Sequence, residues 1–111
     1  TVNADDATTT KRILDFQFEQ QVNGAAGRKL YELFRQAPLS DVKVYADAVG
    51  VTEWSVAKWV WGLEVFARRA AEAGRVSSDA AESWLKNLGD KDRAGTFFAS
   101  MTGFAVRGTR V

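Results

Sequence analysis

Four stretches of the chain carry apolar residues at the spacing of a helix. Apolar side chains three and four positions apart fall on one side of a helix and pack together on a core. The clearest such stripe lies in residues 28–37 and consists of Leu30, Leu33, Phe34 and Ala37. The same spacing predicts helices over residues 8–22, 53–73 and 77–88.

Capping residues, proline and glycine predict where these helices begin and end. Asp5 and Asp6 precede the first helix, where acidic side chains can cap free amides and complement the helix dipole. Pro38 ends the second helix because it cannot continue a helical hydrogen-bond ladder. Gly74 and Gly89 are predicted to stop the third and fourth helices. Residues 90–93 are then expected to form a charged turn.

Two further stretches have the patterns of strands. Residues 41–49 alternate apolar and polar side chains, as in a strand with one packed face. Residues 95–111 are apolar on both alternate sets of positions over their first half, which predicts a strand covered on both faces. A lone pair of strands is marginal in water, so these residues supply only part of the sheet that the last strand requires. The predicted fold class is therefore α/β, or α+β for this chain alone.

The amino-acid composition excludes several kinds of catalytic and metal site. The 111 residues are enough for one domain, and 46% of them are hydrophobic. Cysteine and histidine are both absent, which excludes disulfides, cysteine nucleophiles, histidine bases and zinc sites built on thiolate or imidazole. We therefore expect no metal site.

The net charge and the hydropathy of the chain indicate which partners to expect and where in the cell the protein acts. A formal net charge of +1 argues against a nonspecific nucleic-acid binder. No run approaches the roughly 20 apolar residues of a membrane span, and the N-terminus lacks signal-peptide character. We expect a cytoplasmic protein without nucleic-acid or membrane partners. Because the first residue is Thr1, we also expect a processed chain or a piece of a longer one.

Two features do not fit a simple core pattern. The first helix has an apolar set wider than one stripe, which leaves part of it for a ligand or another chain. Trp54 and Trp61 lie off the apolar stripe of residues 53–73, so they are expected either in an interface or in the wall of a pocket.

Several short motifs, in order along nearly the whole chain, are similar to one enzyme family. The first includes Ala4-Asp5-Asp6 and the Thr-Lys-Arg-Ile-Leu-Asp sequence of residues 10–15, and the last is Gly-Thr-Phe-Phe-Ala-Ser-Met-Thr-Gly-Phe at residues 95–104. Those between them lie at residues 23–24, 27–30, 33–37, 41–42 and 84–85. Together they resemble the C-terminal half of the class I, Rossmann-like S-adenosylmethionine-dependent methyltransferases that act on small molecules.

The resemblance implies a partial methyltransferase domain spanning residues 1–111. The chain would begin at the end of the fifth strand, and the first helix would lie over the active site. Residues 41–49 would be the sixth strand, and residues 53–89 would be a helical insertion. The terminal strand would be the antiparallel seventh, lodged between strands five and six. Pro38 departs from the family, which usually has glycine there, and Ala25 stands where tryptophan is common.

The resemblance also implies a function that this chain cannot perform alone. S-adenosylmethionine would be the cofactor, but the glycine-rich turn that holds it lies in the missing N-terminal half. This half would supply substrate recognition. The residues expected to line a substrate pocket are Phe16, Gln20, Asn23, Trp54 and Trp61.

No catalytic residue can be assigned from the sequence. Tyr45 and Asp47 are the titratable residues best placed to act as a base, although a solvated strand face is the simpler interpretation. Arg68 and Arg69 are expected on a solvated helix face, with anion binding as the alternative.

Two other functions stay open. A methyltransferase half without a cofactor loop could be a non-catalytic interaction or regulatory subunit, which completes a partner enzyme or forms a homodimer. An RNA-binding module of the KH type would need the Gly24-Ala25-Ala26-Gly27 loop to clamp a nucleic-acid backbone. The near-neutral charge and the absence of a strand before the first helix argue against RNA binding. We therefore expect either an N-terminal half or partner chain, or a second copy, together with a small-molecule substrate.

Overall fold

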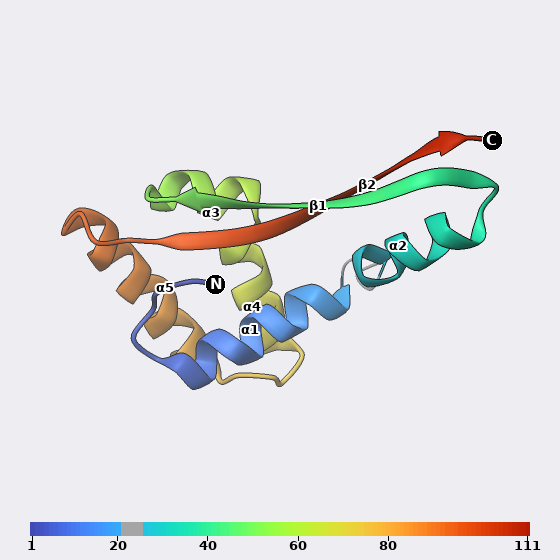
Figure 1. Ribbon diagram of the computed structural model, residues 1–111. Coiled ribbons are helices and arrows are strands. Elements are labelled where there is room, and N and C mark those ends of the chain that lie inside the picture. The colour runs from blue at the N-terminus through green and yellow to red at the C-terminus, as the bar shows by residue number, and fades with distance from the viewer. Residues whose placement is uncertain (21–25) are drawn as a thin grey trace. The chain divides into compact units, whose positions relative to one another are not determined.

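The computed structural model describes residues 1–20 and 26–111 (Figure 1). Within these residues the chain forms five helices and a two-stranded antiparallel sheet, a mixed α/β composition of the α+β kind. The elements in chain order are α1 (Ala7–Gln20), α2 (Ala26–Gln36), β1 (Leu39–Val51), α3 (Trp54–Val60), α4 (Leu63–Glu72), α5 (Ser78–Arg93) and β2 (Ala99–Arg110).

The described residues fall into two compact units. The helical unit comprises Thr1–Gln20 and Gly50–Ser100, and it contains α1, α3, α4 and α5. The ribbon unit comprises the described part of residues 21–49 together with Met101–Val111, and it contains α2 and most of both strands. None of the described helices is long and apolar enough to cross a bilayer.

The core of the helical unit lies where α1 and α5 pack against α4, with α3 at its side. Its largest fully buried side chains are Ile13, Leu63, Trp84 and Leu88. The indole Nε1 of Trp84 donates a 2.8 Å hydrogen bond to Oγ1 of Thr10, which satisfies the one polar atom of that ring. The stripes predicted for residues 8–22 and 77–88 contribute to this core. The stripe predicted for residues 53–73 is wrong over α3, because Val56, Trp59 and Val60 are exposed, whereas Leu63 and Ala67 on α4 are buried.

Helix α5 begins as the sequence predicts but ends later. The side chain of Ser77 caps it by accepting a 3.0 Å hydrogen bond from the amide of Ala80. The prediction that Gly89 stops the helix is wrong, since α5 runs through it to Arg93. The positive φ that ends this segment, +74°, belongs to Gly95 instead. Residues 90–93 therefore form the last turn of the helix and not a separate charged turn.

The helix predicted over residues 53–73 is in fact two helices. Helix α3 ends at Val60, and α4 begins at Leu63 after Gly62, whose φ is +63°. The side chain of Gln17 donates a 2.6 Å hydrogen bond to the carbonyl of Trp61, one of the groups left free at this break. The apolar period does not reveal the break because it continues across both helices.

The two glycines give opposite predictions for substitution by alanine. Gly62→Ala is expected to lower the free energy of unfolding by about 1–2 kcal/mol, because alanine is strained at a positive φ. Gly89→Ala is expected to raise it by about 0.5–1 kcal/mol, since Gly89 lies inside a helix and an added Cβ meets only the Arg93 side chain at 3.6 Å. Urea denaturation of both variants checks the two signs. Equal effects of the two substitutions would contradict the placement of Gly62 between two helices and of Gly89 inside one.

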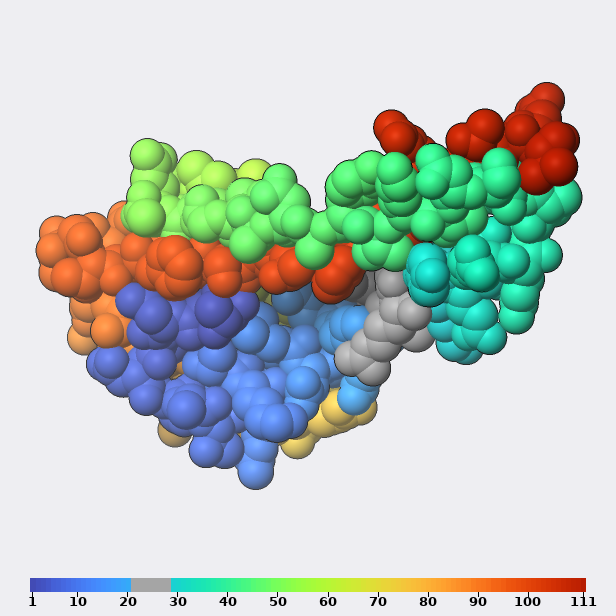
Figure 2. All heavy atoms as spheres, in the orientation of Figure 1, coloured from blue at the N-terminus to red at the C-terminus, as the bar shows by residue number. Residues whose placement is uncertain are grey.

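Strand β2 has a neighbour on each side where it begins. It pairs with β1 on one edge, and Ala99 forms an antiparallel bridge with Val2 on the other. The amide of Ser100 donates to the carbonyl of Thr1 at 2.8 Å, and the amide of Asn3 donates to the carbonyl of Phe98 at 3.0 Å. In Figure 2 the dark-blue N-terminal residues lie directly against the orange start of β2. Residues 1–3 and β1 therefore flank β2, which is antiparallel to both.

The ribbon unit leaves much apolar surface exposed. Met101 is 43% exposed and Phe104 is 57% exposed. The prediction that the terminal strand is covered on both faces is therefore wrong for this chain by itself, because the sheet has only two strands and its helices leave these side chains in contact with solvent.

The turn between α2 and β1 contains Pro38, whose ring excludes a left-handed backbone conformation at that position. The carbonyl of Pro38 accepts a 3.4 Å hydrogen bond from the amide of Val111, at the far end of β2. Among the described residues other than glycine, the positive φ belongs to Asp41, at +52°. Proline is thus accommodated because the left-handed residue lies further along the chain.

Candidate functional site

The parallel segments of the helical unit end at the same edge. Since residues 1–3 and β1 both run antiparallel to β2, they run parallel to each other, and their carboxyl ends lead into Ala4 and Thr52. The polar and aromatic side chains that follow these two ends are the candidate site.

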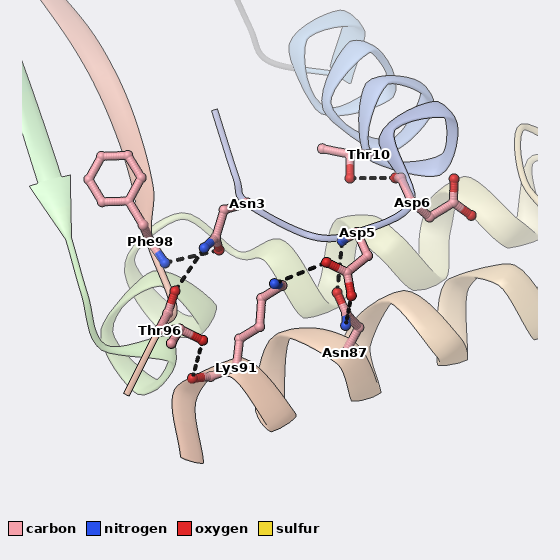
Figure 3. Close-up of polar contacts among 8 residues, drawn as sticks. All are labelled: Asn3, Asp5, Asp6, Thr10, Asn87, Lys91, Thr96 and Phe98. Carbon is pink, nitrogen blue, oxygen red and sulfur yellow. Dashed lines mark hydrogen bonds and ion pairs between the residues drawn. The ribbon is translucent and has the colours of Figure 1, made fainter. Parts of the chain in front are cut away.

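Asp5 follows the first of these segments and is held by α5 (Figure 3). Its amide donates to Oδ1 of Asn87, and Nδ2 of Asn87 donates back to its carboxylate, both at 3.0 Å. Nζ of Lys91 lies 3.0 Å from the other carboxylate oxygen. Hydrogen bonds from Lys91 and Asn87, together with the charge of Lys91, hold the pKa of Asp5 below its ordinary value. An ionised carboxylate engaged in this way is an anchor and not a base poised near neutral pH.

Asp6 immediately precedes α1 and caps its first turn. Its carboxylate accepts from the amide of Thr9 at 3.0 Å and from the Thr9 hydroxyl at 2.6 Å. These hydrogen bonds lower the pKa of Asp6. The capping role expected for this acidic pair therefore belongs to Asp6, while Asp5 reaches across to α5.

Asn3 joins the first segment to the residues that precede β2 (Figure 3). Its Nδ2 donates to the carbonyl of Thr96 at 2.8 Å, and its Oδ1 accepts from the amide of Phe98 at 3.0 Å. The carbonyl of Lys91 in turn accepts from the amide of Thr96 at 2.8 Å. The side chain of Asn3 thus continues the strand pairing where the backbone of residues 1–3 turns away.

Trp54 lies just beyond the carboxyl end of β1. Its amide donates a 2.9 Å hydrogen bond to Oδ1 of Asp92. Its ring packs edge-on against Phe97, with centroids 5.7 Å apart and an angle of 62° between the planes. The indole is half-buried, so one part of it stays accessible. Of the five residues expected to line a pocket, Trp54 follows the carboxyl end of a strand most directly.

The other expected pocket residues are not brought together there. Phe16 is 6% exposed and belongs to the core, with the guanidinium of Arg75 5.7 Å from its ring centroid. Trp61 is half-buried against the same core, while Gln20 is exposed at the end of α1. Asn23 lies outside the described residues. Phe16 is therefore a packing residue, and the four expected residues that the structure describes do not form one cavity wall.

A pocket of about 240 Å³ lies elsewhere, between α4 and the start of α5. It contains none of the five expected residues, and its lining consists of Arg68, Ala71, Glu72, Ser78, Ala81 and Glu82. Arg68 is paired with the carboxylates of Glu64 at 3.3 Å and Glu82 at 3.6 Å. Its charge is thus already partnered within the chain.

The other residues considered for anion binding or as a base are Arg69, Tyr45 and Asp47. Arg69 lies over the Phe66 ring at 5.9 Å from its centroid. Tyr45 is 49% exposed and Asp47 is also exposed, both on β1 of the ribbon unit. Within the described residues, no group of three or more acidic side chains could hold a metal ion.

Sequence reasoning missed several residues of the candidate edge. Asn3, Asn87, Lys91 and Asp92 each hold a segment that is distant in sequence. Nothing in the local pattern marks them, because their partners lie up to 95 residues away along the chain.

Comparison with known proteins adds no family to this description. No protein-family model, curated protein or solved structure matches the chain.

Proposed function

We propose that this chain is the substrate-facing, C-terminal half of an S-adenosylmethionine-dependent methyltransferase that acts on a small molecule. In this proposal it is incomplete without an N-terminal half of Rossmann-like fold, which carries the cofactor site. Methyl transfer is an in-line displacement at a sulfonium carbon, so the protein mainly positions the nucleophile. The part supplied by this chain is that positioning.

One observation carries the proposal: the order of the segments around β2. The terminal strand lies between residues 1–3 and β1 and is antiparallel to both. The resemblance in sequence implies this same order, with the seventh strand between the fifth and the sixth. The hydrogen bonds on both sides of the start of β2 are those that this order requires, and they support the proposal.

The candidate edge supports the same assignment. Trp54 and the polar residues around Asp5 follow the carboxyl ends of parallel segments, where such folds bind their ligands. The ion pair of Asp5 and Lys91 holds the chain after residues 1–3 in place. Trp54 is then the residue that we assign to substrate contact.

Native mass spectrometry of the chain as isolated, with and without S-adenosylmethionine, tests the proposal. The 111-residue chain alone is expected to show no cofactor-sized mass shift and no methyl transfer. A complex with a second polypeptide of roughly 130–160 residues, which would complete a domain of ordinary size, is expected to show the shift. Cofactor binding and methyl transfer by the chain alone would overturn the requirement for another half.

A matched pair of tryptophan variants tests the assignment of Trp54 in such a complex. Trp54→Phe keeps an aromatic ring against Phe97 but removes part of the accessible indole, so KM for the substrate should rise roughly two- to tenfold, the value of one aromatic contact. Trp59→Phe alters a ring that is 80% exposed and is expected to leave KM unchanged. Equal KM values for both variants would remove Trp54 from the site.

A non-catalytic interaction subunit is the second candidate. It is favoured by the exposed apolar side chains of α3, where Trp59 is 80% exposed and Val60 is 71% exposed. A complex with a second polypeptide that takes up no cofactor would support this function instead.

A further inference from the structure

The last turn of α5 fixes the backbone beside both rings of the Trp54 and Phe97 pair. Oδ1 of Asp92 accepts a 2.9 Å hydrogen bond from the amide of Trp54. The carbonyl of Lys91 accepts hydrogen bonds from the amide of Thr96 at 2.8 Å and from its hydroxyl at 3.3 Å. Thr96 directly precedes Phe97, whose ring packs edge-on against Trp54. Two neighbouring residues of α5 therefore hold the chain next to each ring.

Helix α3 obtains the hydrogen-bond acceptor at its start from Asp92 and not from its own sequence. It has seven residues, and a helix so short is unstable without tertiary contacts. Glu53, which precedes it, has an extended backbone and makes no capping hydrogen bond with its side chain. Asp92 binds one of the amides that every helix leaves free at its start. Ala57 alone among the residues of α3 is fully buried, so apolar packing holds this helix at few points.

Asp92 lies where α5 itself does not favour a carboxylate. The last turn of a helix carries the negative end of the helix dipole, which favours cations. Lys91 and Arg93 meet that preference, whereas Asp92 between them does not. The half-buried side chain of Asp92 bonds instead to the start of α3, where the dipole favours an anion. The contact thus serves α3 and its first residue, Trp54.

We infer that Asp92 is a positioning residue, whose hydrogen bond to the amide of Trp54 keeps the indole against Phe97 at the candidate site. Because Trp54 begins α3, a helix start that is not held moves the amide and the indole together. The placement of the indole can be tested on the chain alone. Its consequence for a substrate rests on the proposed function, so either can fail without the other.

Acrylamide quenching of tryptophan fluorescence tests the placement. In a full chain that carries Trp59→Phe and Trp61→Phe, the remaining tryptophans are Trp54 and Trp84. Trp84 is 1% exposed, so the quenchable emission belongs to Trp54. Asp92→Ala is expected to raise the quenching constant of Trp54 roughly twofold or more, since loss of a capping hydrogen bond favours the form that is not held by at least about that factor. Asp92→Asn keeps the Oδ1 acceptor and should stay close to the natural chain.

Two further variants separate positioning from other effects of the change. Asp90→Ala removes a carboxylate from the same turn, but that side chain pairs with Lys86 and Arg93 on α5 itself, so the quenching should not change. Glu53→Ser added to Asp92→Ala gives α3 a capping residue of its own without restoring the link to α5. The indole should stay more accessible in this double variant than in the natural chain.

Four outcomes would overturn the inference. Quenching of Asp92→Ala equal to that of the natural chain would show that the hydrogen bond does not place the indole. Quenching of Asp92→Asn equal to that of Asp92→Ala would exclude the hydrogen bond as the cause. Recovery of natural quenching on adding Glu53→Ser would show that Asp92 is only a helix cap. A Trp84 that also becomes quenchable would show a general loss of the core.

Discussion

Trp84→Ala is expected to be the most destabilising single change in the helical unit. The side chain is 1% exposed, and its indole Nε1 is hydrogen-bonded to Thr10. Truncation of a buried tryptophan costs about 3–5 kcal/mol, because the lost contacts leave a cavity that the surroundings fill only in part. That loss is a large fraction of the stability of a small domain, which is about 5–15 kcal/mol.

Thermal unfolding followed by circular dichroism checks this expectation. At about 4–8 °C for each kcal/mol in a unit of this size, Tm should fall by at least roughly 12 °C. Trp59→Ala is the matched control, since that ring is 80% exposed and its loss should cost less than about 0.5 kcal/mol. Trp84→Phe separates the hydrogen bond from the volume and should be intermediate. A Trp84→Ala chain as stable as the control would show that this core is misassigned.

Ile13→Ala is expected to have the second-largest effect. Ile13 is fully buried on α1, the helix that packs against α4 and α5. Its replacement by alanine should cost about 2–5 kcal/mol, and Ile13→Val, which removes one methylene, about 0.5–1.5 kcal/mol. The graded pair therefore reports how tightly α1 is packed on the helical unit.

Urea denaturation of the two Ile13 variants gives both values from the midpoints of the transitions. Leu33→Ala on α2 is the control, because that leucine is 56% exposed and its apolar surface is not buried within this chain. Equal losses for valine and alanine at position 13 would argue against a close-packed site. A large loss for Leu33→Ala would show that α2 buries more than its exposure indicates.

Local pattern predicted the elements better than their ends. The stripe of Leu30, Leu33 and Phe34 lies on α2 as expected, and the alternation of Val42 and Val44 lies on β1. Gly89 and Gly62 show why the ends are harder to predict. Glycine can take helical and left-handed backbone conformations equally well. Only the packing around each glycine decided that Gly89 continues α5, while Gly62, with φ of +63°, separates α3 from α4.

The candidate site could be predicted only in part. The sequence places Trp54 off the predicted helical stripe, in an interface or a pocket wall. In the structure it lies just past the carboxyl end of β1 and packs in part against the core of the helical unit. Phe16 was grouped with it on pattern alone, but the helix turns Phe16 into the core at 6% exposure. A phenylalanine is equally apolar in a core and in the wall of a pocket, so the sequence cannot distinguish these two positions for Phe16.

By itself, the sequence determined the mixed α/β composition, the apolar faces of α1 and α5 and the absence of cysteine and histidine chemistry. These follow from residue type and period, which act over a few neighbouring positions. Only the tertiary structure decided that Asp5 is held by Asn87 and Lys91, and that the amide of Trp54 is bound by Asp92. Such contacts join residues far apart along the chain. Whether these contacts form depends on the folded path of the backbone, which the local spacing of apolar residues does not predict.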